Sequence, residues 1–92
     1  MVFARQLRDR IVRGEITCTV RIWLSARVRV GGRYPLGAGW VEVRSVKEIE
    51  LSDISPELAR RSGFAGVVDL IKTAKHGRGE RVFLIDFEYR PV

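Results

Sequence analysis

The stretch Ile16-Thr17-Cys18-Thr19-Val20-Arg21-Ile22-Trp23 predicts the strand on which the fold and the candidate site both depend. Its β-branched and aromatic side chains alternate along the chain, as is typical of a strand. One face carries Cys18, Val20 and Ile22, and the other carries Thr17, Thr19, Arg21 and Trp23. Three polar side chains and a large aromatic beside a core are unusual. We therefore expect the second face to line a binding surface, and Cys18 on the first to be a buried apolar filler.

The segment before this strand, from Phe3 to Gly14, predicts an amphipathic helix. Ala4, Leu7 and Ile11 recur at helical spacing, and charged side chains fill the opposite face. Gly14 suits the position just beyond the helix end, where a left-handed backbone closes the last turn.

The segment after the strand contains further extended chain. Arg27 to Val30 alternates and ends at Gly31-Gly32, which predicts a short strand with Arg27 and Arg29 facing outward. Residues 33–39 hold a proline and two glycines, which indicates an irregular loop or a bent edge strand. Trp40 to Glu50 predicts a long strand that bends after Val43, where the apolar parity changes.

The C-terminal half predicts a helical pair and a closing strand. Ser55-Pro56 begins a short helix that runs from Pro56 to Ser62 and ends at Gly63. A second helix runs from Phe64 or Ala65 to Lys75. Its inward side chains are expected to be Val67, Val68 and Ile71. The last strand spans Arg81 to Tyr89, and one of its faces carries Phe83, Ile85, Phe87 and Tyr89. This order predicts an α+β fold built on a curved, mostly antiparallel sheet or small β-barrel flanked by helices.

Length and composition limit the classes of function. The chain has 92 residues, enough for one domain over residues 1–92 but not for a two-domain cleft. No apolar run approaches the roughly 18–20 residues of a membrane span, and the N-terminus lacks the apolar core of a secretory signal, so we expect a cytoplasmic protein with no membrane partner. One cysteine and one histidine argue against a zinc site, and no cofactor is implied.

A net charge of +6, with 14 arginines among the 17 basic residues, indicates a polyanionic partner, most often nucleic acid. The alternative is that an arginine-rich surface simply solvates the fold. The sequence leaves the oligomeric state open.

Several separated segments together resemble the ASCH domain, a family related to the PUA domains that bind RNA. They are residues 14–21, the turn at 30–32, and the segments 46–49, 59–64 and 82–87, so the resemblance covers nearly the whole chain. It implies a PUA-like β-barrel flanked by helices and an RNA-related role.

The family signature places glycine, lysine, glutamate and arginine where this chain has Gly14, Ile16, Thr19 and Arg21. Bacterial relatives that hydrolyse N4-acylated cytidines also carry threonine in the glutamate position. The resemblance maps their catalytic threonine to Thr19, their lysine to Ile16 and their glutamate to about Ser62. Because a threonine hydroxyl needs a base and both partners are replaced, we expect binding rather than catalysis, with amidohydrolysis of a modified cytidine as the alternative. His76, the one base that titrates near neutrality, is expected to be a solvated residue at a helix end.

The predicted site binds RNA or a nucleotide-like ligand in a shallow pocket around Arg21. A guanidinium, hydroxyls and an aromatic surface can hold a base and a nearby phosphate. Its candidate residues are Thr17, Thr19, Arg21, Trp23, Arg27, Arg29, Arg33, Tyr34 and Ser62. A structural role for Arg21, paired with Asp86 or Glu42, is one alternative, and a basic face that binds a protein is another.

Overall fold

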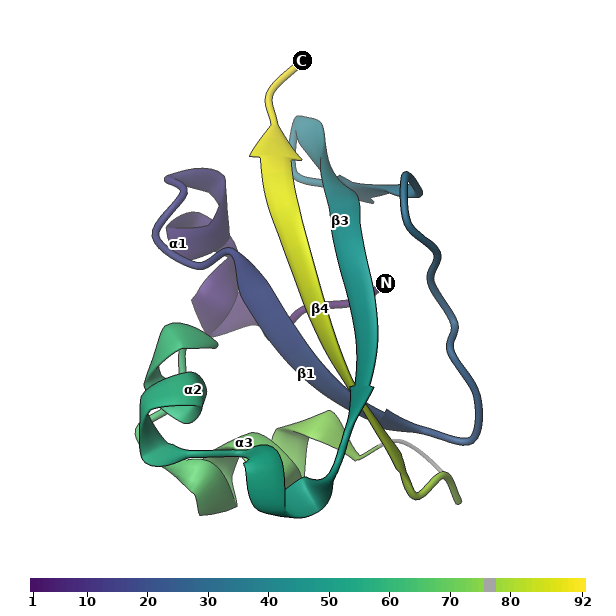
Figure 1. Ribbon diagram of the computed structural model, residues 1–92. Helices are drawn as coiled ribbons and strands as arrows, with labels where there is room; N and C mark the ends of the chain where they lie inside the picture. The colour runs from purple at the N-terminus through teal and green to yellow at the C-terminus, as the bar shows by residue number, and fades with distance from the viewer. Residues whose placement is uncertain (76–77) are drawn as a thin grey trace.

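The computed structural model describes residues 1–75 and 78–92 and shows helices packed around a single sheet (Figure 1). The helical elements are η1 (Arg5–Leu7), α1 (Arg8–Val12), η2 (Leu51–Asp53), α2 (Pro56–Arg61) and α3 (Val67–Ala74), of which η1 and η2 are 3-10 helices. The strands are β1 (Cys18–Trp23), β2 (Arg33–Leu36), β3 (Gly39–Ile49) and β4 (Arg81–Arg90). His76 lies outside the described residues.

The sheet is antiparallel throughout, with the strand order β1-β4-β3-β2, and it curls into a half-barrel. The prediction of an α+β fold on a curved antiparallel sheet is confirmed. The predicted bend in the long strand is confirmed too, because the β3–β4 register shifts between Val43 and Ser45. Arg44 is the extra residue of this bulge, which increases the local twist. The sheet does not close, since β1 and β2 are its two edges.

The two faces of the sheet are covered by different parts of the chain. The helical pair packs on the face that carries Cys18, Val20 and Ile22, with Leu58 and Leu70 at the centre of that cluster. The N-terminal segment packs on the other face, where the ring centre of Phe3 lies 5.3 Å from that of Phe87 in a tilted arrangement. Both faces of β1 are therefore covered, and so are both faces of β4 from Val82 to Phe87, whereas Arg81, Glu88 and Arg90 of β4 are exposed. The two layers meet beside β1, which lies at the edge of the sheet (Figure 1).

The helix signals around α2 behave as predicted. The hydroxyl of Ser55 accepts the N–H of Leu58 at 3.0 Å, and Pro56 occupies the first turn. Gly63 ends the helix with φ +95°, and a Cβ there would lie 2.7 Å from the side chains of Leu7 and Ile16. Glycine at this position therefore permits both the left-handed turn and the close approach of the helical pair to the N-terminal layer.

The predicted strand over Arg27 to Val30 does not form. This segment is an extended loop, and Gly31 and Gly32 after it form the backbone hydrogen bonds to Val43, at 2.8 and 2.9 Å. The helix predicted from Phe3 is also shorter, because regular α-helix begins only at Arg8 after a 3-10 turn. The first strand begins at Cys18 rather than Ile16.

The predicted inward face of α3 is wrong at one residue. Val68 is 66% exposed, whereas Leu70 is fully buried. Residues three and four apart share a helix face, so Val67, Leu70, Ile71 and Ala74 make the inward stripe. Val68 follows Val67 by about 100° of rotation and points away.

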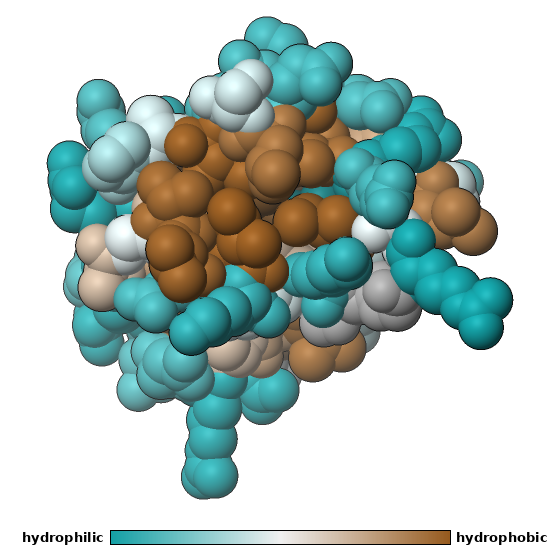
Figure 2. Space-filling view, turned by 90° about the horizontal axis from the view of Figure 1, so that it is seen from below, coloured by the Kyte–Doolittle hydropathy of each residue, from teal (hydrophilic) through white to brown (hydrophobic). Residues whose placement is uncertain are grey.

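An apolar area is exposed on the face of the molecule at the helical end (Figure 2). Leu51 of η2 is 53% exposed and borders a shallow depression together with Ile22, Ile71 and Val82. Within the described residues, no helix has the length and hydropathy that a membrane span requires.

The α3 assignment predicts unequal effects for two matched truncations. Leu70→Ala removes a fully buried side chain from the cluster under the helical pair, so it should lower the free energy of unfolding by about 2–5 kcal/mol. Val68→Ala should change it by less than about 0.5 kcal/mol. Urea denaturation of both variants measures this. Comparable losses in the two would contradict the helix orientation.

Candidate functional site

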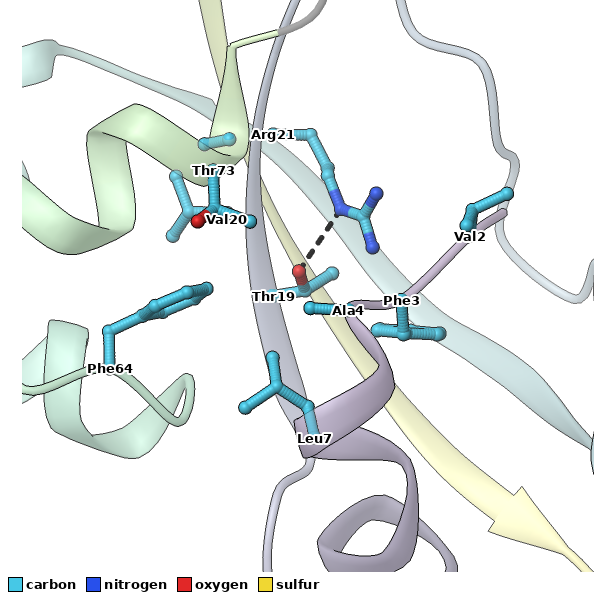
Figure 3. Close-up of a pocket in the computed structure, with 10 residues that line it drawn as sticks. Val2, Phe3, Ala4, Leu7, Thr19, Val20, Arg21, Phe64 and Thr73 are labelled. Atoms are coloured by element: carbon cyan, nitrogen blue, oxygen red, sulfur yellow. Dashed lines mark hydrogen bonds between the residues drawn. The ribbon is translucent and has the colours of Figure 1, made fainter.

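Arg21 is a buried cation at the outer edge of the sheet. It is 7% exposed, and its Nε donates a hydrogen bond to the Thr19 hydroxyl at 3.1 Å (Figure 3). The guanidinium carbon lies 5.0 Å from the centre of the Phe3 ring, which is within cation–π range. The two residues share one face of β1, so the strand itself sets their spacing.

No carboxylate pairs with Arg21 in the part of the chain that the structure describes. Asp86, one proposed partner, instead accepts a hydrogen bond from the Ser45 hydroxyl at 2.9 Å. Glu42, the other, forms ion pairs with arginines of the sheet. The ion-pair alternative for Arg21 is therefore wrong for both named carboxylates.

The electrostatics of this position favour an anion. Burial lowers the pKa of Arg21 from its usual range to about 10, so the side chain is still a cation at neutral pH. The α-amino group of Met1 also has a lowered pKa, because burial and the positive charge of Arg21 both oppose its protonation. The hydrogen bond to Thr19 uses only the Nε of Arg21. Among the described residues, Trp40 Nε1 is the one fully buried side-chain nitrogen or oxygen without a hydrogen bond, so the two terminal nitrogens of Arg21 are not fully buried and keep access to solvent or ligand.

A pocket of about 200 Å³ lies beside Arg21, and we call it the Arg21 pocket. It is enclosed by the N-terminal segment, β1, Phe64 and α3 (Figure 3). Its lining residues are Val2, Phe3, Ala4, Leu7, Thr19, Val20, Arg21, Phe64, Thr73 and Ala74. The pocket thus combines apolar side chains and two aromatic rings with two hydroxyls and one guanidinium.

The outer edge of β1 adds backbone groups to this pocket. Phe87 donates its N–H to the carbonyl of Thr17, and Thr19 and Arg21 stand opposite Ile85 and Phe83 in the same register. Residues of an antiparallel pair alternate between bonding the neighbour and facing away from it. Val20 therefore directs its N–H and its C=O away from β4, toward the pocket that it lines.

A second depression of about 220 Å³, here the Trp23 pocket, adjoins the first. It is lined by Met1, Val2, Arg21, Trp23, Arg27 and Val28. Val2 and Arg21 line both pockets, so Arg21 stands on the wall between them.

The structure brings four of the predicted site residues to these pockets: Thr19, Arg21, Trp23 and Arg27. Trp23, however, is only 3% exposed and packs at 6.0 Å on Phe83, so its ring is largely covered. The aromatic side chains that line the Arg21 pocket are Phe3 and Phe64 instead (Figure 3).

Two other predicted residues lie apart from the Arg21 pocket. Ser62 is 2% exposed, and its hydroxyl lies 3.5 Å from the Cys18 sulfur, on the opposite face of β1 from Arg21. Cys18 is buried as expected. Thr17 is exposed and precedes β1.

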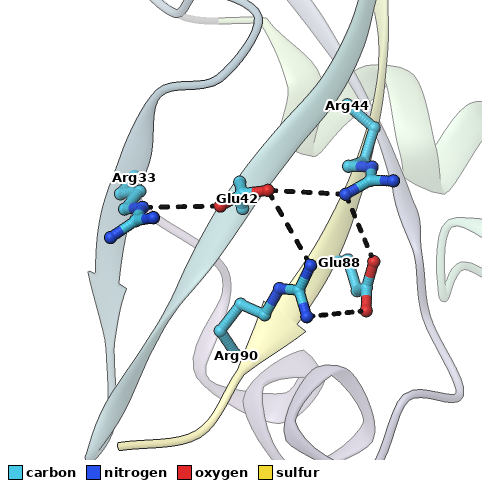
Figure 4. A network of polar contacts seen from close by, with 5 residues as sticks. All are labelled: Arg33, Glu42, Arg44, Glu88 and Arg90. Atoms are coloured by element: carbon cyan, nitrogen blue, oxygen red, sulfur yellow. Dashed lines mark hydrogen bonds and ion pairs between the residues drawn. The ribbon is translucent and has the colours of Figure 1, made fainter.

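The predicted rim residues are dispersed. Arg33 lies on the outward face of the sheet, where Arg33, Arg44 and Arg90 surround Glu42 and Glu88 at 3.4–4.0 Å (Figure 4). Its guanidinium also stacks at 5.3 Å on Trp40. Arg29 is exposed, and its backbone N–H donates to the hydroxyl of Tyr34 at 3.3 Å.

Sequence reasoning missed the residues that enclose the Arg21 pocket from outside β1. Leu7 was interpreted as part of the apolar face of a helix that begins at Phe3, and Phe64 and Thr73 come from a distant part of the chain. Gly63 was a usable signal, because a helix that ends in a left-handed glycine turns the next side chain, Phe64, back toward the sheet.

The lining of the Arg21 pocket fits binding better than hydrolysis. Its described residues include no carboxylate and no imidazole that could deprotonate the Thr19 hydroxyl. Instead, Arg21 donates a hydrogen bond to that hydroxyl. Ile16 is buried against Leu7 rather than open to the pocket. In the described part of the chain no cluster of three His, Cys, Asp or Glu side chains could hold a metal ion.

Two substitutions at this site should move stability in opposite directions. Arg21→Met keeps the apolar stem beside Phe3 and removes a buried charge without a counterion, so the free energy of unfolding should stay level or rise by up to about 2 kcal/mol. Thr19→Val leaves the Nε of Arg21 without its acceptor and should cost about 1–3 kcal/mol. Thermal and urea unfolding test both. A large loss in Arg21→Met would mean that the charge holds the fold together.

Comparison of the chain with known proteins identifies no relative: no family model, no curated protein and no solved structure matches it.

Proposed function

We propose that the protein binds RNA or a nucleotide-like ligand, and that Arg21 holds a phosphate of it. The observation that supports this most directly is the burial of Arg21 beside an open pocket without a carboxylate partner among the described residues. An anion that arrives with the ligand would supply the missing countercharge, and arginine matches the oxygens of a phosphate through two parallel N–H donors.

The distribution of charge along the chain supports a polyanionic partner on this side of the molecule. Residues 1–46 hold nine arginines and three carboxylates, whereas residues 47–92 hold eight basic and eight acidic residues. The net charge of +6 therefore originates in the half of the chain that supplies most of the pocket wall. Such an asymmetry steers an anionic ligand toward the site.

The remaining groups of the pocket suit a nucleobase. The ring of Phe64 offers a surface on which an unpaired base can stack. The N–H and C=O of Val20 present a donor and an acceptor side by side, the kind of pair that reads the edge of a base. The hydroxyls of Thr19 and Thr73 add further polar contacts.

The resemblance to the ASCH domain agrees with this proposal and would make the half-barrel a PUA-like fold in the cytoplasm. A free thiol at Cys18 is compatible with a reducing compartment. The alternative function, hydrolysis of an N4-acylated cytidine, would need a base that the described lining of the Arg21 pocket does not supply.

A nucleotide titration tests the proposal. In 15N-HSQC spectra, uridine 5′-monophosphate should shift the amide signals of Thr19, Val20 and Arg21 more strongly than uridine, because the phosphate contacts Arg21. Arg21→Met should lose most of the difference between the two ligands, and binding should weaken by about 0.7 log unit per log unit of salt for each phosphate engaged.

The matched control is Arg33→Gln. Arg33 is also an arginine of the sheet, but it pairs with Glu42 on the outward face, so its removal should leave nucleotide binding unchanged. Equal effects of the two variants would show that general positive charge, and not the Arg21 pocket, attracts the ligand. Unaltered binding by a folded Arg21→Met protein would overturn the proposal.

A further inference from the structure

We infer that the ligand is a single-stranded oligonucleotide that lies along a groove of three adjoining pockets, rather than a free mononucleotide. This inference rests on the proposed function and specifies its ligand class. The groove runs between the N-terminal segment, which supplies Phe3 and Leu7, and the helical layer, which supplies Phe64 and Thr73. The outer edge of β1 borders it only as far as Ile22, which pairs with Lys75.

The three pockets share walls, which makes the groove continuous. Beyond Phe64 lies a third depression of about 350 Å³, here the Lys72 pocket, lined by Gln6, Gly63, Phe64, Ala65, Asp69, Lys72 and Thr73. It shares Phe64 and Thr73 with the Arg21 pocket, which in turn shares Val2 and Arg21 with the Trp23 pocket. A polymeric ligand can therefore extend from one pocket into the next along these shared side chains.

Cations are spaced along this path. Lys72 stands at one end, Arg21 in the middle and Arg27 at the other end, where it also lies 6.0 Å above the Trp23 ring. The described residues that line the three pockets include one acidic side chain, Asp69 in the Lys72 pocket. Repeated cations with an intervening aromatic are the arrangement that tracks the backbone of a single strand.

The size of the pockets also favours a polymer. The Arg21 and Trp23 pockets, at about 200 and 220 Å³, are each smaller than the roughly 300–1,000 Å³ of sites that enclose a whole small molecule. From Thr19 to Trp23 the strand advances about 13 Å, and the turn of α3 from Asp69 to Thr73 adds about 6 Å. At about 3.4 Å per stacked nucleotide, the groove accommodates at most about six nucleotides.

A length series tests the inference. Uridine 5′-monophosphate and oligouridylates of two to eight residues are titrated into the labelled protein, and affinity is followed by calorimetry. We expect affinity to rise with length and to level off near six residues. The hexamer should shift amide signals near Lys72 and Arg27 in addition to those of Thr19, Val20 and Arg21.

Variants at the two ends separate the groove from the central pocket. Lys72→Gln and Arg27→Gln should each weaken the hexamer about two- to fivefold, as expected for an exposed ion pair, and leave the mononucleotide unaffected. The matched controls are Lys47→Gln, on the exposed part of β3, and Arg29→Gln, two residues further along the loop from Arg27. Neither lines the three pockets, so both should bind the hexamer normally.

The outcomes distinguish the two levels of the proposal. If the mononucleotide and the hexamer bind equally, with shifts confined to Thr19, Val20 and Arg21, the single-strand inference is wrong and the proposed function stands. If neither ligand shifts these residues, the proposed function fails as well. A second RNA hexamer, of self-complementary sequence and supplied as a duplex, tests the strand requirement. If it binds as well as the single-stranded hexauridylate, the inference is also overturned.

Discussion

The pairing of β4 between β1 and β3 is the constraint on which the rest of the molecule depends. β4 contributes Val82 and Leu84 to the core under the helical pair, and Phe83, Ile85 and Phe87 to the cores under the N-terminal segment. From Val82 to Phe87 the side chains of β4 are buried or half-buried on both faces, so each of them must pack against a neighbouring layer. This pairing also makes β1 an edge strand of the sheet, whose N–H and C=O groups at Val20 point away from β4.

Arg21 is a buried charge that this arrangement leaves without a carboxylate partner among the described residues. An isolated charge in an apolar setting is costly, and its cost is normally offset by a carboxylate. Here Phe3 and the Thr19 hydroxyl offset part of it. A ligand phosphate would complete the compensation, so the same burial that weakens the unliganded fold would strengthen the contact with an anion.

The outward face of the sheet offers a useful contrast. Its arginines, Arg33, Arg44 and Arg90, are neutralised in part by Glu42 and Glu88 at the surface (Figure 4). Exposed pairs of this kind contribute little to stability, but they leave less free positive charge there. In the groove, by contrast, neither Arg21 nor Arg27 has a carboxylate partner among the described residues.

The sequence by itself determined the fold class, the bulge after Val43, the capped start of α2 at Ser55 and the position of Arg21 and Thr19 on one strand face. These features depend on local signals: side-chain periodicity, turn residues and strand alternation. Tertiary structure alone decided that Trp23 is covered by Phe83, that Val68 faces outward, and that Ser62 meets Cys18 instead of the pocket. It also brought Phe64 and Thr73 of the helical layer against Phe3 of the N-terminal layer. Alternation along a strand assigns side chains to faces but not to partners, because partners are set by the layers that fold over each face.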